Sequence, residues 1–432
     1  MYILQPKCVT RSPFAKSFLK KRLTRPSFTS ARAQIHAREK RAMTRSTPST
    51  DVMLRCLTAA MVVGALRPGR DLDLIAGAFL AARTEDEARL VGLGITRTAW
   101  SLDSVKEQQC RARLRFDRDG VLELMAALDF PAEWTTPSGS RFTGEEAMTF
   151  YLRRMAFPNS LLNLSNEEWK AQPSALSEVF TMVGRWMYEH HTYRLLQTGI
   201  SKWSERVEEY RDKVSELTGF RNERFGIFAF VDGTAREISR PGRFQRAFYS
   251  GHKRHHIVQF LSVTAPDGMI LFTYGPTGVH NDNWLLNESQ LATRLLPDLE
   301  RIKGSRYVIY GDPIFGRSMY VQRGFGRIEA TDEELAWNEG MNAARVTEEW
   351  CFGRVAQLWQ FIDFSKTHKL HSTSPARTYL NAQFLTNCHN CMYGGNQISQ
   401  YFECPPPSLH DYLNMDELPG AAAAPHAAVP DM

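Results

Sequence analysis

The sequence predicts an α/β protein in which a mixed sheet with flanking helices follows a mainly helical N-terminal region. Between about residue 143 and residue 219, apolar side chains recur at the three- and four-residue spacing of helices. Beyond Thr218-Gly219 the pattern changes to short β-rich runs that alternate with helical segments. Several strands, a helix, another strand and further helices indicate one mixed sheet packed against helices.

The region 51–219 is predicted to be mainly helical. Two capping boxes, Thr143–Glu146 and Ser165–Glu168, indicate helix starts, and a longer helix is expected after Pro173-Ser174. A short helix, a turn and a longer helix within about 143–200 are typical of a helix-turn-helix. An ordinary helical bundle is the alternative, because these helices lack an obvious basic face. Residues 51–140 carry no motif with a recognisable chemistry.

The sheet is predicted from four strands and two helical segments within 220–413. The expected strands are Phe228–Val231, Val258–Val263, Met269–Tyr274 and Tyr307–Tyr310. The expected helices are Trp284–Ile302 and the amphipathic stretch Arg345–Ile362. The Ala- and Pro-rich residues 414–432 are expected to form a disordered tail.

The net charge of +6 conceals a strongly basic N-terminal segment. Residues 1–50 hold twelve Lys or Arg against the single acid Glu39, which leaves about −5 for residues 51–432. This segment is consistent with a DNA-binding arm, with a nuclear signal around Lys20-Lys21-Arg22, or with a mitochondrial transit peptide. A solvated tail without function is the remaining alternative. We expect a nuclear location, with a mitochondrial one as the alternative.

Cysteine usage and hydropathy favour a soluble protein of a reducing compartment. Seven cysteines are scattered through 432 residues without the spacing of a disulfide framework. The longest apolar stretch near the N-terminus, Cys56–Leu66, is about half of the ~20 residues that a membrane span requires. No membrane partner is therefore expected.

Three acidic residues have the local context of a metal-dependent nuclease site. Asp232 follows the apolar run Phe228–Val231, and Asp312 follows the run Tyr307–Gly311. Glu349 lies in the amphipathic stretch 345–362. Two strand ends and a helix can bring such residues together. Carboxylate oxygens are the ligands that Mg²⁺ and Mn²⁺ prefer, and two such ions can catalyse phosphodiester cleavage.

The residues around this triad resemble a known family. The matching motifs are Tyr249–Arg254, Pro266–Gly268, Gly275-Pro276, Tyr310–Pro313, Glu349–Gly353, Leu385–Cys391 and Cys404–Pro407. Together they resemble the DDE superfamily endonuclease domain of PIF/Harbinger-type transposases and Harbinger-derived nucleases. The resemblance covers roughly 225–413 and weakens over 143–219, where the family has a helix-turn-helix-like segment. It implies an RNase H-like fold.

The resemblance also assigns roles to individual residues. Asp232 matches the first carboxylate of the family motif, Asp312 the second, and Glu349, three residues before Phe352, the third. This spacing favours Glu349 over Glu348, and the two side chains point about 100° apart on a helix. Asp282 matches an accessory acid and a further metal ligand, although Asn281 stands where the family usually has His.

The implied activity is that of a divalent-metal-dependent DNA endonuclease or transposase that uses Mg²⁺ or Mn²⁺. The resemblance implies DNA as a partner and allows a separate DNA-binding protein; it does not indicate the oligomeric state. Arg345 matches a family position, while Lys253 and Arg254 are candidate phosphate contacts or a solvated strand edge. The alternatives are a domesticated, non-catalytic DNA- or protein-binding descendant and a decayed element copy.

The cysteine cluster Cys388–Cys391 raises a second metal hypothesis. Its C-x₂-C step, with His389 and Cys404 as further ligands, could hold zinc. A second paired step is absent, and His389 lies between the two cysteines. The favoured interpretation is therefore a helix whose cysteines pack beside the catalytic layer.

Overall fold

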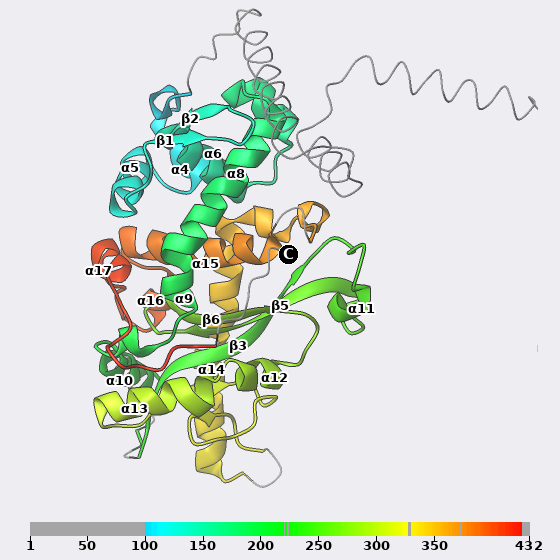
Figure 1. Ribbon diagram of the computed structural model, residues 1–432. Helices are drawn as coiled ribbons and strands as arrows, with labels where there is room; N and C mark the ends of the chain where they lie inside the picture. The colour runs from blue at the N-terminus through cyan, green and yellow to red at the C-terminus, as the bar shows by residue number, and fades with distance from the viewer. Residues whose placement is uncertain (1–99, 220, 223, 327–329, 371–373, 426–432) are drawn as a thin grey trace, which may run out of the picture. The chain divides into compact units, whose positions relative to one another are not determined.

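The computed structural model describes residues 100–425, except 220, 223, 327–329 and 371–373. The chain divides after Thr96, and all described residues belong to the unit Arg97–Met432. The predicted basic segment 1–50, the following residues to 99 and the last residues 426–432 lie outside the described part. Within the described unit, the expected mixed α/β architecture with a preceding helical region is confirmed (Figure 1).

The helical region precedes the sheet and contains one small hairpin. Its helices are α4 (Glu107–Leu114), α5 (Arg118–Ala127), α6 (Gly144–Ala156), α7 (Leu161–Leu164), α8 (Pro173–Met187), α9 (Tyr193–Leu196) and α10 (Val207–Thr218). The hairpin pairs β1 (Glu133–Thr135) with β2 (Arg141–Thr143). Helix α8 packs against α6, α7 and α15 through a buried apolar face. Such packing is expected of an ordinary bundle, and the helix-turn-helix interpretation stays a prediction.

The two predicted capping boxes have different outcomes. The Thr143 hydroxyl accepts a hydrogen bond from the amide of Glu146, and the amide of Thr143 donates one to the Glu146 carboxylate, so α6 begins as predicted. The start predicted at Ser165 is wrong, because the preceding helix already begins at Leu161 with Ser160 as its cap. The Ser165 hydroxyl instead donates to the carbonyl of Ala171 in the buried turn that follows.

The predicted strands form one mixed sheet. They correspond to β3 (Gly226–Glu237), β5 (His255–Thr264), β6 (Ile270–Thr277) and β7 (Tyr307–Gly311), joined by the two-residue strands β4 (Tyr249–Ser250) and β8 (Val321–Gln322). The central order is β6-β5-β3-β7-β8, and β4 pairs with the start of β5. The β6–β5–β3 pairs are antiparallel, whereas β3–β7–β8 are parallel. Strand β3 is therefore central, and almost all of its first half is buried.

Helices pack against this sheet directly or through another helix. They are α12 (Asp282–Glu288), α13 (Leu296–Lys303), α14 (Asp332–Leu358), α15 (Pro375–Met392), α16 (Gln397–Tyr401) and α17 (Leu409–Leu413). Helix α14 packs against β3 and α15, and α15 packs against β6. The single helix predicted over 284–302 is wrong, since Gln290 adopts a left-handed conformation (φ 55°) that separates α12 from the turn preceding α13. No helix in the described residues is long and apolar enough to cross a membrane.

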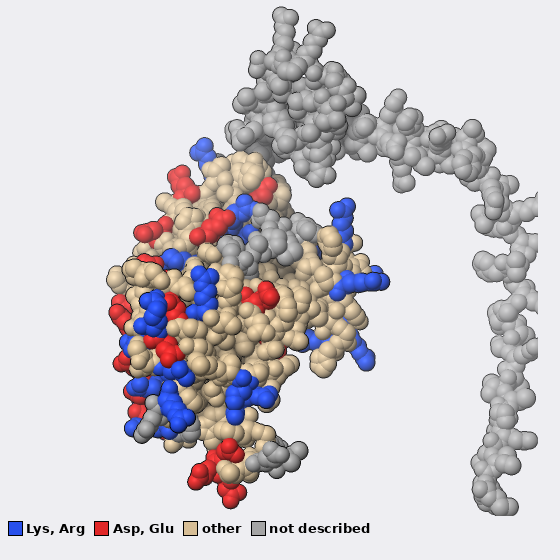
Figure 2. Space-filling model, turned by 60° about the horizontal axis from the view of Figure 1, so that its bottom comes forward, with Lys and Arg blue, Asp and Glu red and all other residues tan. Residues whose placement is uncertain are grey.

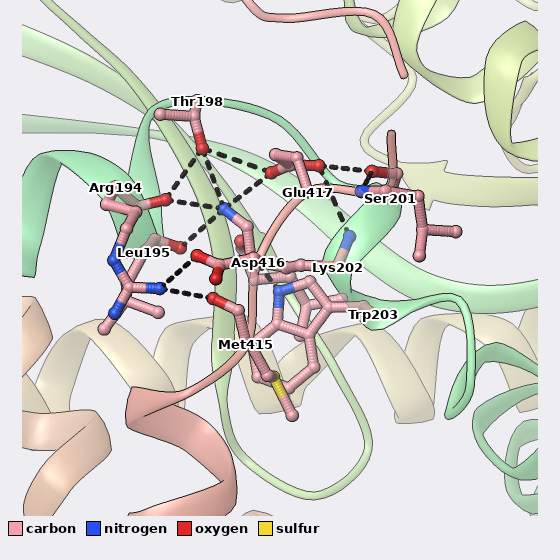
Figure 3. Close-up of polar contacts among 11 residues, drawn as sticks. Arg194, Leu195, Thr198, Ser201, Lys202, Trp203, Met415, Asp416 and Glu417 are labelled. Atoms are coloured by element: carbon pink, nitrogen blue, oxygen red, sulfur yellow. Dashed lines mark hydrogen bonds and ion pairs between the residues drawn. The ribbon is translucent and has the colours of Figure 1, made fainter. Parts of the chain in front are cut away.

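The segment after α17 lies against the turn between α9 and α10 (Figure 3). The guanidinium of Arg194 donates to the carbonyls of Leu413 and Met415. The fully buried ammonium of Lys202 lies 2.7 Å from the carboxylate of Glu417. Farther along, the amide of Ala422 donates to Asp298 at 2.7 Å. The expectation of a disordered tail from residue 414 is therefore corrected for the residues up to 425, because polar side chains of the fold bind this backbone.

Candidate active site

The parallel pairing of β3 and β7 brings two of the predicted carboxylates together. Val231 of β3 is the register partner of Gly311 of β7. Asp232 follows Val231 and Asp312 follows Gly311, so the two aspartates lie side by side. Neighbouring strands lie about 4.8 Å apart, and residues in register point to the same face of the sheet. The two side chains, separated by 80 positions in the sequence, are therefore neighbours at the centre of the sheet.

The glycines beside these aspartates allow the close approach. A Cβ on Gly311 would lie 2.7 Å from the ring of Phe315 and 2.9 Å from the Val231 side chain. A Cβ on Gly233 would collide with the carboxyl group of Asp282, at the start of α12. Asp282 therefore packs directly over the residue that follows Asp232, and it becomes the third carboxylate of the site.

Helix α14 presents two glutamates with different environments. Glu348 is fully buried, and neither of its carboxylate oxygens has a hydrogen-bond partner in the structure. The charges of Asp232 and Asp312 both raise the pKa of Glu348, which places it beside the two aspartates. Glu349 is exposed. Sequence reasoning favoured Glu349 and set Glu348 aside; the assignment of Glu349 stays a prediction, and Glu348 is a second candidate.

Burial of like charges raises the pKa of several of these carboxyl groups. Burial, opposed by a hydrogen bond from the Gly233 amide and by the charge of Arg345, raises the pKa of Asp232 to about 6. Burial also raises the pKa of Asp282, and raises that of Glu348 well above its usual range. Groups that repel one another in a partly dry site are characteristic of metal or catalytic centres rather than of structural ion pairs.

Two cations border the carboxylates. Arg345 lies on α14 and its charge lowers the pKa of both Asp232 and Glu348. It is four residues before Glu349, so Glu349 lies on the same side of the helix as Arg345. Lys253, in the connection between β3 and β5, lowers the pKa of Asp282. Both cations were noted in the sequence, and the structure brings both to the edge of the site.

The donor groups match the chemistry of a hard divalent cation. The carboxylates of Asp232, Asp282, Asp312 and Glu348 are oxygen donors of the kind that Mg²⁺ and Mn²⁺ prefer. The unpartnered oxygens of Glu348 are the kind of buried acceptors that a cation would satisfy. As the side chains stand, no three His, Cys, Asp or Glu residues in the described ranges converge closely enough to hold a metal. Side-chain rotation would be needed to draw these oxygens together.

The cysteine cluster is part of the protein core. Cys388 and Cys391 lie on α15 together with His389. Burial raises the pKa of both thiols and lowers the pKa of His389 to about 4. The thiolate that binds zinc is therefore disfavoured at both cysteines. The packing interpretation of this cluster is supported.

Comparison with known families identifies the domain. Residues 231–387 match the family of the DDE superfamily endonucleases. The chain therefore contains a DDE superfamily endonuclease domain, and the mixed sheet with its flanking helices is consistent with the RNase H-like fold of such domains. The match begins beside Asp232 and includes Asp282, Asp312, Glu348 and Glu349. No curated protein and no solved structure matches the chain.

Proposed function

We propose that this protein is a divalent-metal-dependent DNA endonuclease or transposase of the PIF/Harbinger type. The observation that carries the proposal is the register of β3 and β7, which aligns Asp232 with Asp312 inside a DDE superfamily endonuclease domain. A pair of neighbouring, partly buried carboxylates that repel each other destabilises a fold unless a cation or a proton neutralises them. A bound divalent cation would neutralise the two carboxylates and so offset their repulsion.

In this proposal Asp232, Asp312 and Glu349 hold Mg²⁺ or Mn²⁺, and Asp282 is an accessory ligand. Glu349 is chosen because of its spacing from Phe352-Gly353, which matches the family motif. The bound cations would supply an activated water and charge stabilisation for phosphodiester cleavage. Because Gly233 has no Cβ, it leaves room for the Asp282 carboxyl group beside Asp232, and Arg345 limits the repulsion between the carboxylates.

The substrate proposed is DNA, and the location proposed is the nucleus. The strongly basic segment 1–50 supports both, because clustered Lys and Arg side chains bind phosphates and are also typical of nuclear signals. A separate DNA-binding protein as partner fits this proposal, since α8 packs its apolar face into the core instead of forming a free recognition helix.

Nicking of supercoiled plasmid tests this function. Wild-type protein should convert plasmid to the nicked form in Mg²⁺ or Mn²⁺ and not in EDTA, and Asp312→Asn should abolish nicking. A matched control is Asp363→Asn, which changes a carboxylate that pairs with Arg236 away from the triad. Nicking that survives Asp312→Asn would overturn the assignment. A folded wild type without metal-dependent nicking on any DNA would favour the non-catalytic descendant.

A further inference from the structure

The connection between β3 and β5 is an acid-free basic segment that projects beside the site. We call residues 239–254, which include α11 (Gln245–Phe248) and β4, the β3–β5 arm. It carries Arg240, Arg243, Arg246, Lys253 and Arg254, all of them exposed. The sequence contains no Asp or Glu from Ile238 to Pro266. Figure 2 shows blue side chains without red ones on the lobe at the right, the side on which α11 lies in Figure 1.

The cations of this arm are available for a partner. None of the five makes an ion pair with a carboxylate in the part of the chain that the structure describes. Elsewhere on the surface Arg and Lys often have such partners, for example Arg301 with Asp298 and Arg306 with Glu300. A cluster of unpaired cations attracts a polyanion, and the phosphate backbone of DNA is one.

Phe244 at the start of α11 is an unusual side chain for a solvated surface. Its exposed fraction is 74%, the highest among the large hydrophobic residues of the described chain. Its backbone is left-handed (φ 56°), a conformation that is uncommon for residues other than Gly, Asn and Asp and is strained for a bulky one. Arg243 and Arg246 flank it. The Phe244 carbonyl accepts a hydrogen bond from the Ala247 amide, which holds this turn, while its ring has no aromatic partner among the described residues. An exposed aromatic held in a strained conformation between arginines indicates a binding role.

The arm is fixed next to the carboxylates. The amide of Val279 donates to the carbonyl of Ala247 in α11 at 2.8 Å, and Phe248 is buried. A Cβ on Gly278 would collide with the same Ala247 carbonyl. The loop that holds α11 thus leads within three residues to Asp282. The charge of Lys253, at the other end of the arm, also reaches Asp282, whose pKa it lowers against the effect of burial. A DNA strand with a phosphate at the carboxylates would therefore extend over the arm.

From this arrangement we infer that the β3–β5 arm binds DNA beside the cleavage site and that Phe244 stacks on an unpaired base there. The arginines and Lys253 contact phosphates, and the ring of Phe244 covers a base face. Aromatic side chains stack on bases of any sequence, and an unpaired base offers a free face without the cost of opening a pair. The inference rests on the proposed function only for the identity of the partner and deepens it by naming the DNA structure that is preferred.

Equilibrium binding without metal tests the inference separately from catalysis. Fluorescence anisotropy in EDTA would compare the full chain on a 30-base-pair duplex and on the same duplex with one unpaired adenine. We expect Arg243→Ala/Arg246→Ala to weaken binding to both DNAs by about tenfold and to lower the slope of log K against log salt by about 2. Phe244→Ala should leave duplex binding unchanged and weaken binding to the unpaired-base DNA by about tenfold.

The control is Arg221→Ala/Arg224→Ala, which removes two exposed cations from the segment that precedes the first residue of β3. It should change neither affinity by more than about twofold. Unchanged binding and salt slope in Arg243→Ala/Arg246→Ala would overturn the arm as the DNA surface. Equal affinities of Phe244→Ala and wild type for both DNAs would overturn stacking. A smaller assembly of Phe244→Ala than of the wild type in light scattering would assign Phe244 to a protein contact instead. Plasmid nicking by the same variants reports the proposed function independently.

Discussion

Replacing Asp232 by Asn should stabilise the metal-free protein. Burial raises the pKa of this carboxyl from its usual 3.8 to about 6, so keeping it ionised at pH 7.5 is unfavourable. A difference of about 2 in pKa corresponds to about 3 kcal/mol, and partial exposure to solvent reduces this to about 1.5 kcal/mol. Asn keeps the oxygen that accepts the Gly233 amide hydrogen bond. At about 2 °C per kcal/mol for a unit of this size, the expected rise in Tm is about 3 °C.

The stability gained by Asp232→Asn should depend on pH. Because the folded-state pKa is the higher one, the native protein binds more protons, and the wild type loses stability as the pH rises from about 4 through about 6. The advantage of Asp232→Asn should therefore be full at pH 7.5 and vanish near pH 4. Differential scanning calorimetry in EDTA at several pH values measures it.

A matched control has the opposite sign. Asp298 accepts hydrogen bonds from Arg301 and from the Ala422 amide, and its pKa is lowered. Asp298→Asn should therefore lower the Tm at pH 7.5. A Tm of Asp232→Asn at or below that of the wild type in EDTA would refute the claim that the site is held together at the expense of stability.

Three further predictions concern the site and its surroundings. Glu349→Gln should abolish nicking and also the rise in Tm that Mn²⁺ induces. Glu348→Gln should raise the Tm of the metal-free protein and retain the rise that Mn²⁺ induces. The reverse pattern would assign Glu348 as the ligand. Gly233→Ala should displace Asp282 and reduce nicking about tenfold with a fall in Tm of only about 2 °C, and full activity would contradict the packing described. Glu417→Gln leaves Lys202 buried without its counterion and should cost about 2–3 kcal/mol in urea unfolding; Glu417→Leu/Lys202→Met should recover most of this loss, and an unchanged midpoint in the single variant would contradict it.

The strands were predictable because burial imposes a local pattern on them. The apolar runs that end at Val231 and Tyr310 are buried on both sides of a central sheet, and such runs are visible in sequence. The break at Gln290 was not, since no glycine or proline marks the left-handed residue. The order around the tail was missed because its contacts, such as Lys202 with Glu417, join residues 215 positions apart.

The proximity of three carboxylates was expected from the sequence, and their role as a site stays a prediction. The resemblance to the family motifs pointed to Asp232, Asp312 and Asp282, which the structure brings together through strand register and a glycine contact. The burial of Glu348 depends on which side of α14 faces β3. Met341, Ala344, Cys351 and Val355 share that buried side, so their spacing was the available signal. It was outweighed by the match of Glu349 to the family motif.

Binding of Mn²⁺ by isothermal titration calorimetry tests the central claim most directly. The full chain would be titrated as wild type and as Asp232→Asn/Asp312→Asn, with Asp363→Asn as the control. Saturable Mn²⁺ binding is expected in the wild type and in the control. No binding is expected in the double variant, which should be folded and more stable than the metal-free wild type. Equal binding by all three proteins would contradict the claim that the aligned aspartates of β3 and β7 form a metal-dependent nuclease site.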